Sequence, residues 1–151
     1  MKYLDDFKEG FSETTGSYTV TEDEVVAFAR AYDPQPIHTD KAFAAKGLFG
    51  GLIASGWQSC GIAMRLLVDH VIKDVAVIAS PGVDQIRWLL PVRPGDVLHL
   101  KWTILDIRKS TTKPDRGIVR AQSDLINQKD ETVMSLVGVT IVLTRPSTPN
   151  C

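Results

Sequence analysis

The chain has 151 residues, an apolar fraction of 44%, a charged fraction of 23% and a formal net charge of -1. This length suits one domain with a core of ordinary size, and the balanced composition excludes a disordered chain and a polyanion-binding surface. We therefore expect no nucleic-acid partner. The first residues lack the apolar run of a signal peptide and no segment is long enough to cross a bilayer, so we expect no membrane partner and a cytoplasmic location.

The first predicted elements are a short strand over residues 16–20 and a helix over residues 22–32. Thr21 suits the N-cap position, and Glu24 at the third helical position completes a capping box. Four apolar side chains follow helical spacing and so lie on one face of this helix: Val25, Phe28, Ala29 and Tyr32.

The next segment carries an acid and a histidine on either side of two prolines, from Asp33 to His38. Each proline fixes its own φ and disfavours helix for the residue before it, so the helix must stop near Tyr32 and the segment is stiff. A stiff loop preorganises a general acid–base pair, although an Asp before Pro is also a common helix end and a loop His is commonly solvated. If extended, the segment would separate the two Cα atoms by about 15 Å, so joint action requires the loop to turn back.

A short helix near residues 41–45 and a glycine-rich stretch over residues 47–56 follow, and then a long, mostly apolar helix over residues 57–71. Apolar residues occur on nearly every side of this helix, so we expect it to be largely buried. Trp57 and Met64 on this helix are candidates for an acyl pocket, but core filling is the favoured role for both.

The second half of the sequence alternates strand patterns with turn residues. Strands are predicted over residues 85–89, 97–108, 117–127 and 132–144, with breaks over residues 91–96, 112–117 and 127–130. One long central helix wrapped by an antiparallel sheet is the hotdog fold. We therefore expect a single α+β hotdog domain over residues 1–145, followed by a flexible C-terminal tail over residues 146–151.

Three stretches carry a family resemblance that extends in order and spacing over almost the whole chain: residues 33–38, 50–56 and 91–96. They resemble the MaoC-like dehydratases and the (R)-specific enoyl-CoA hydratases. The hydratase motif of that family, Asp-x-Asn-Pro-(Leu/Ile/Val)-His, is matched by Asp33, Pro36, Ile37 and His38. Gln35 stands in place of the motif asparagine, and Ser55 precedes Gly56 where many family hydratases have a histidine.

The resemblance implies an acyl-thioester hydratase or dehydratase that adds water reversibly to a 2-enoyl thioester without a cofactor. By resemblance, Asp33 and His38 hold one water: neutral His38 takes its proton as the oxygen attacks C3, and Asp33 fixes the water. The backbone N–H of Gly56 is the candidate donor to the enolate oxygen, because a helix N-terminus offers unpaired N–H groups. The other candidate oxyanion or substrate-binding residues are Ser55, Gln35, Trp57 and Met64. The implied partners are an acyl-CoA or acyl-carrier thioester and a second copy, in a homodimer or higher even oligomer.

Other chemistries for the same residues are less favoured. Asp33, His38 and Asp40 form a sparse metal-ligand set with no second His or Cys nearby, so we expect no metal. Ser59 and Cys60 are candidate nucleophiles, but they sit in an apolar helix where small side chains commonly serve packing.

Two further function classes stay open. A hotdog thioesterase activates water with a carboxylate near the central helix, and residues 57–63 contain no Asp or Glu. That absence favours hydration over thioester hydrolysis. A noncatalytic acyl-thioester binder, or a subunit that lends structure to a larger assembly, is not excluded by the sequence.

Overall fold

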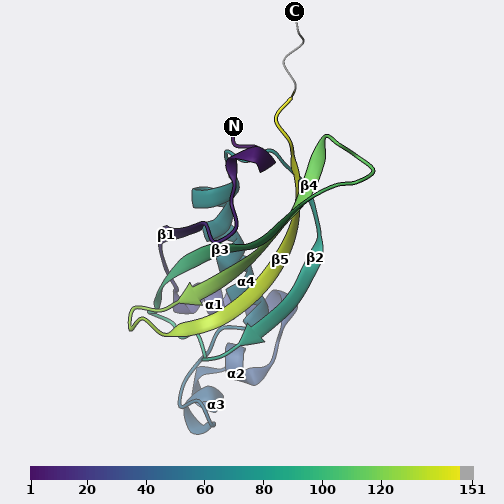
Figure 1. The fold of residues 1–151 in the computed structure, drawn as a ribbon. Helices are drawn as coiled ribbons and strands as arrows, with labels where there is room; N and C mark the ends of the chain where they lie inside the picture. Colours follow the sequence, from purple (N-terminus) through teal and green to yellow (C-terminus); the bar gives the residue numbers. More distant parts are fainter. Residues whose placement is uncertain (147–151) are drawn as a thin grey trace, which may run out of the picture.

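A computed structural model describes residues 1–146 of the chain. One five-stranded antiparallel sheet, in the order β1-β3-β4-β5-β2, curves around helix α4 (Figure 1). The expected α+β hotdog architecture is confirmed. The strands are β1 (Ser12–Thr19), β2 (Val77–Trp88), β3 (Val97–Lys109), β4 (Arg116–Ile126) and β5 (Thr132–Leu143). The helices are α1 (Glu22–Tyr32), α2 (Pro36–Thr39), α3 (Lys41–Lys46) and α4 (Gly56–Leu67), with short turns η1 (Leu4–Asp6) and η2 (Val68–Ile72).

The main core lies between the sheet and one side of α4. In β4, buried positions alternate with half-buried ones along the whole strand, so one face of the sheet packs inward. Ile62 and Leu66 of α4 pack in one cluster with Leu98, Leu100 and Leu125 of the sheet. This packing fixes α4, and with it the position of the first turn of α4.

Helix α1 has the predicted bounds and Thr21 is its N-cap as predicted, but the Glu24 carboxylate accepts from the Thr21 hydroxyl and not from the Thr21 N–H that a capping box uses. The Thr21 Oγ1 atom accepts a hydrogen bond from the Glu24 backbone N–H at 3.3 Å and donates to Glu24 Oε2 at 3.0 Å. Helix α3 also lies where a short helix was expected. The capped α1 ends at Asp33, so its last turn places that carboxylate.

The expectation that the central helix is buried on nearly all sides is wrong. Helix α4 begins at Gly56 and ends at Leu67, and the chain continues as the π-helical turn η2. Trp57 is 58% exposed and Met64 is 53% exposed, so core filling is also wrong for both. Seven residues make nearly two helical turns, so Trp57 and Met64 share one exposed face of α4.

Two edge strands are longer than predicted. Strand β2 begins at Val77, ahead of the predicted start at residue 85, and it contains Pro81 and Gly82, which are uncommon inside strands. Irregular pairing of β2 with β5 accommodates these residues, and an edge strand tolerates proline. Strand β1 begins at Ser12 and has an irregularity between Thr14 and Ser17 in its pairing with β3.

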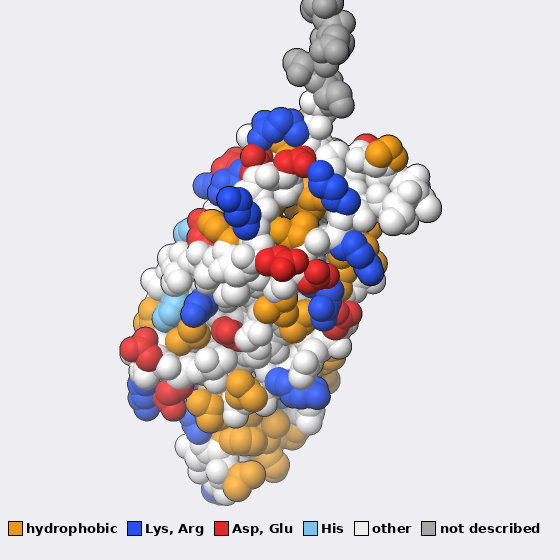
Figure 2. Space-filling model, viewed as in Figure 1, with side chains coloured by type: hydrophobic (Ala, Val, Ile, Leu, Met, Phe, Trp, Pro, Cys, Tyr) orange, Lys and Arg blue, Asp and Glu red, His pale blue; other side chains and the backbone are white. Residues whose placement is uncertain are grey.

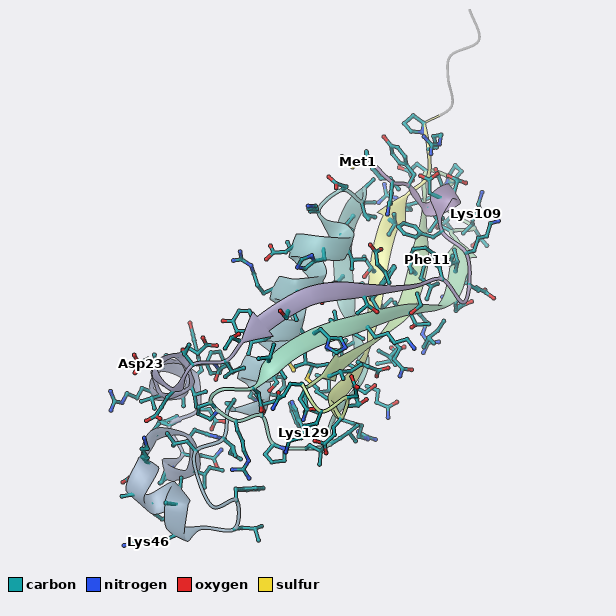
Figure 3. All side chains as sticks on the ribbon, turned by 90° about the vertical axis from the view of Figure 1, so that its left-hand side faces the viewer. Met1, Phe11, Asp23, Lys46, Lys109 and Lys129 are labelled. Carbon is teal, nitrogen blue, oxygen red and sulfur yellow. The ribbon has the colours of Figure 1, made fainter. Side chains whose placement is uncertain are left out.

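Helices α1, α2 and α3 gather at one end of the molecule, and the β3–β4 turn lies at the other. Lys46 at the end of α3 and Lys109 at the end of β3 mark these two ends (Figure 3). Hydrophobic side chains gather on the surface at the helical end (Figure 2). No helix within residues 1–146 is long and apolar enough to cross a membrane. The expected flexible tail, except Pro146, lies outside the described residues.

Candidate active site

A sharp turn after α1 brings Asp33 and His38 together. The Asp33 N–H caps α1 by donating to the Ala29 carbonyl at 2.8 Å, and the Gln35 N–H then donates to the Asp33 carbonyl at 2.8 Å. Pro36 occupies the first turn of α2, where its missing N–H does no harm. The single turn of α2 folds the chain back, so His38 Nε2 lies 3.3 Å from Asp33 Oδ2. The stiff loop of the sequence analysis is therefore a helical turn, and it turns back as joint action requires.

The other ring nitrogen of His38 sets the tautomer of the imidazole. His38 Nδ1 lies 2.7 Å from the carbonyl oxygen of Ile53, and the His38 side chain is buried. A carbonyl oxygen can only accept, so Nδ1 carries the proton and donates it. In the neutral imidazole, Nε2 is then the free acceptor, and this atom faces Asp33.

The Asp33 carboxylate accepts hydrogen bonds from two side chains. Gln35 Nε2 donates to Asp33 Oδ1 at 2.7 Å, and Ser55 Oγ donates to Asp33 Oδ2 at 2.7 Å. The Gln35 bond and then the Ser55 bond lower the pKa of Asp33 below its ordinary value of 3.8, against the raising effect of burial. The carboxyl group is therefore ionised at neutral pH.

Ser55 lies behind the site. It is the N-cap of α4, its side chain accepts from the Trp57 backbone N–H at 3.3 Å, and its exposed fraction is 0%. A residue without exposed surface does not touch a ligand in this conformation, so the hydroxyl joins Asp33 to the start of α4. The sequence marked Ser55 as a departure from the family motif and as a candidate oxyanion or substrate-binding residue, and it did not indicate this bond.

A cleft of about 420 Å³ opens beside these groups. Asp33, Gln35 and His38 line it together with Gly56 and Trp57 at the start of α4. Apolar side chains complete its walls, including Phe49, Trp88, Leu89 and Leu90. Few polar groups within apolar walls are typical of a small-molecule site.

Most of the sequence-predicted site residues meet at this cleft, and Met64 does not. Met64 lies on the same face of α4 as Trp57, but about 10 Å further along the helix axis, and it does not line the cleft. Trp88, which the sequence did not indicate as a site residue, lines the cleft from the end of β2. A single aromatic residue at the end of a strand is not recognisable as a site residue from one sequence.

Of the less favoured candidates, Ser59 lines the cleft, whereas the metal site and the Cys60 nucleophile find little support in the geometry. Within residues 1–146, no group of three or more His, Cys, Asp and Glu side chains is arranged to hold a metal ion. Asp40 instead caps α3, where its Oδ1 atom accepts from the Phe43 N–H at 2.9 Å. Burial raises the pKa of the Cys60 thiol, which disfavours the nucleophilic thiolate.

The fold and site define a hotdog-fold protein with an aspartate–histidine pair in an apolar cleft. The family model of the MaoC-like domain matches residues 9–125, and the chain belongs to this family. It is 33% identical to the uncharacterized protein YdeM of Bacillus subtilis over 127 residues, which are 84% of this chain and 89% of that protein.

Two other similarities extend over most of the chain. A protein of Mycobacterium tuberculosis named 3-hydroxyacyl-thioester dehydratase Z is 30% identical over 138 residues, which cover 88% of this chain and 78% of that protein. The crystal structure of a MaoC-like dehydratase from Rhodospirillum rubrum superimposes with a TM-score of 0.90 at 40% identity, over 97% of this chain and 100% of that one.

Proposed function

We propose that the protein catalyses the reversible addition of water to the double bond of a 2-enoyl thioester. The observation that carries the proposal is the 3.3 Å approach of His38 Nε2 to Asp33 Oδ2 in a cleft that Gly56 also lines. The dehydratase name of the Mycobacterium tuberculosis relative supports the same reaction class. The proposed substrate is carried as an acyl-CoA or an acyl-carrier thioester.

In the proposed reaction, one water binds between Asp33 and His38. The neutral Nε2 atom of His38 takes a proton from this water as its oxygen forms a bond to C3 of the enoyl group. The electrons of the double bond move onto the thioester carbonyl as an enolate. The imidazolium then returns a proton to C2, which completes the addition of water. Asp33 orients the water and stabilises the charge that appears on His38.

The enolate oxygen requires donors at the other end of the acyl group. Gly56 is the first residue of α4, where backbone N–H groups have no partner within the helix. The N–H of Trp57 donates to Ser55 Oγ, whereas within residues 1–146 the N–H of Gly56 has no hydrogen-bond partner. This N–H group, at the positive end of the helix dipole, is the proposed oxyanion donor.

A homodimer, or a larger even oligomer, is proposed as the working form. Strand β2 lies at an edge of the sheet and is exposed along almost its whole length. An uncovered strand edge favours pairing with another strand. Large apolar side chains are also exposed on β2, on the outer face of α4 and at the first residue of η2, namely Val77, Ile78, Val83, Trp57, Met64 and Val68.

Thioester hydrolysis is the second candidate, because Asp33 is a carboxylate in the cleft and could activate water against the thioester carbonyl. Asp33 is the one Asp or Glu among the residues that line the cleft. Its pairing with the free nitrogen of His38 favours hydration, because hydration requires a group that takes a proton and then returns it. A noncatalytic binder would bind acyl thioesters without turning them over.

One assay separates these three candidates. The purified protein is mixed with crotonyl-CoA and with longer and branched enoyl-CoA substrates, and both the enoyl absorbance and the release of free thiol are followed. Hydration predicts loss of absorbance with no thiol, and the Asp33→Asn variant should lose the activity. Asp40→Asn is the matched control, because this acid caps α3 and does not line the cleft. Thiol release, or binding without turnover, would contradict the proposal.

A further inference from the structure

The indole of Trp88 lies directly against the backbone of Gly56. Trp88 is the last residue of β2, and its Nε1–H donates to the Gly56 carbonyl oxygen at 2.9 Å. Strand β2 and the first turn of α4 are far apart in sequence, and this bond joins them at the cleft. A side chain from the sheet therefore contacts the turn that carries the proposed oxyanion donor.

This contact explains why residue 56 must be glycine. A Cβ atom on Gly56 would lie 2.5 Å from Cε2, 2.6 Å from Nε1 and 2.9 Å from Cδ2 of Trp88. Such distances are far inside van der Waals contact, so any side chain would displace the indole. The φ angle of Gly56 is not positive. Close approach of the indole, and not an unusual backbone conformation, therefore requires the glycine.

The indole of Trp88 also contacts the ring of Trp57. The rings of Trp57 and Trp88 pack edge to face, with centroids 5.3 Å apart and planes inclined by 78°. Trp88 is nevertheless 48% exposed, so it adds less to the core than a buried tryptophan would. Its hydrogen bond and its ring packing both involve the first turn of α4.

We propose that Trp88 is a positioning residue for the reaction, an inference that rests on the proposed hydration. Its hydrogen bond fixes the Gly56 carbonyl, and its ring closes one side of the Gly56 backbone. Ser55 Oγ fixes the Trp57 N–H of the same turn. The two restraints together hold the unpaired Gly56 N–H in its orientation toward the cleft, ready for the enolate oxygen. Trp88 acts through Gly56 and does not take part in proton transfer.

The first test removes the hydrogen bond and keeps an aromatic ring. Trp88→Phe should lower kcat for enoyl-CoA hydration about 10-fold or more, because displacement of a transition-state donor by a fraction of an ångström weakens its bond. KM should stay within about twofold, because the apolar wall remains. Trp102→Phe is the matched control: Trp102 is 7% exposed in the second core cluster, away from the cleft. It should lower thermal stability more than Trp88→Phe does and leave kcat unchanged. An unchanged kcat in Trp88→Phe would overturn the proposal.

The second test does not depend on activity. Gly56→Ala should destabilise the native protein through overlap with the indole, and the same substitution in a Trp88→Ala background should be nearly neutral in thermal unfolding. Equal destabilisation in both backgrounds would show that Trp88 does not restrain Gly56, and would overturn the proposal. If the native protein hydrates no enoyl thioester, the proposed function fails, and this coupling still decides whether Trp88 holds the turn.

Discussion

The hydroxyl of Ser55 donates a hydrogen bond to the Oδ2 atom of Asp33 at 2.7 Å. The same hydroxyl accepts from the Trp57 N–H at 3.3 Å, and its side chain is fully buried. One small side chain therefore links the acid at the end of α1 to the start of α4. In the proposed mechanism, these two places hold the water and the enolate oxygen.

Ser55→Ala should lower the hydration activity more than it lowers the stability of the fold. Loss of the helix cap and of a bond to a charged group should lower the free energy of unfolding by about 1–3 kcal/mol. We expect kcat to fall at least about 10-fold while KM changes little, because Ser55 touches no substrate. Steady-state hydration kinetics and urea unfolding measure the two effects.

Thr21→Ala is the control for that variant. It removes the cap of α1, where Thr21 Oγ1 accepts from the Glu24 N–H at 3.3 Å, and should lower stability by about 1 kcal/mol. It should leave kcat unchanged. If the two variants lose kcat equally, the effect of Ser55 comes from stability alone and its link to Asp33 is not functional.

The pKa of Asp33 should respond to Gln35. The Gln35 amide is the largest cause of the lowered pKa, so Gln35→Ala should move the pKa upward, and carbon NMR of the Asp33 carboxyl group measures the move. A carboxyl group whose pKa is lower in the folded state stabilises the fold above its unfolded-state pKa, and this stabilisation disappears as pH falls through the folded-state value. The native protein should therefore be more stable than Gln35→Ala at about pH 6, and the difference should shrink at about pH 3. A difference that stays the same at both pH values would contradict the assigned cause.

The exposed edge of β2 leads to a prediction about assembly. Light scattering at micromolar concentration should report a dimer or a larger even oligomer, because pairing at this edge would cover unpaired backbone groups and exposed apolar side chains. Val83→Lys places a charge at an exposed position of β2 and should weaken the assembly. A monomer of the native protein at these concentrations would contradict the prediction.

Local signals in the sequence predict much of this fold. Thr21 and Glu24 define the start of α1, the prolines after Asp33 define its end, and the strands β3, β4 and β5 agree with their predicted ranges within one residue or two. These elements follow from caps, turns and alternating apolar residues, which act within a few positions of the chain. The irregular edge strands carry weaker patterns, and their bounds were predicted less well.

The contacts at the site depend on tertiary structure and were less predictable. Apolar composition alone does not say which face of α4 packs on the sheet, so Trp57 and Met64 were both assigned to the core. The bonds from Ser55 to Asp33 and from Trp88 to Gly56 join residues 22 and 32 positions apart. No local pattern encodes such pairs, because they form only when α1, α4 and β2 meet at one end of the sheet.

The central claim is that Asp33 and His38 act on one water. The most direct measurement is the rate constant for enoyl-CoA hydration in Asp33→Asn, His38→Ala and the double variant, each confirmed to be folded. Either single change should remove most activity and the double variant should be little slower than the worse single one, because both residues serve the same step. Near-native activity in either single variant, or losses that multiply in the double variant, would contradict it.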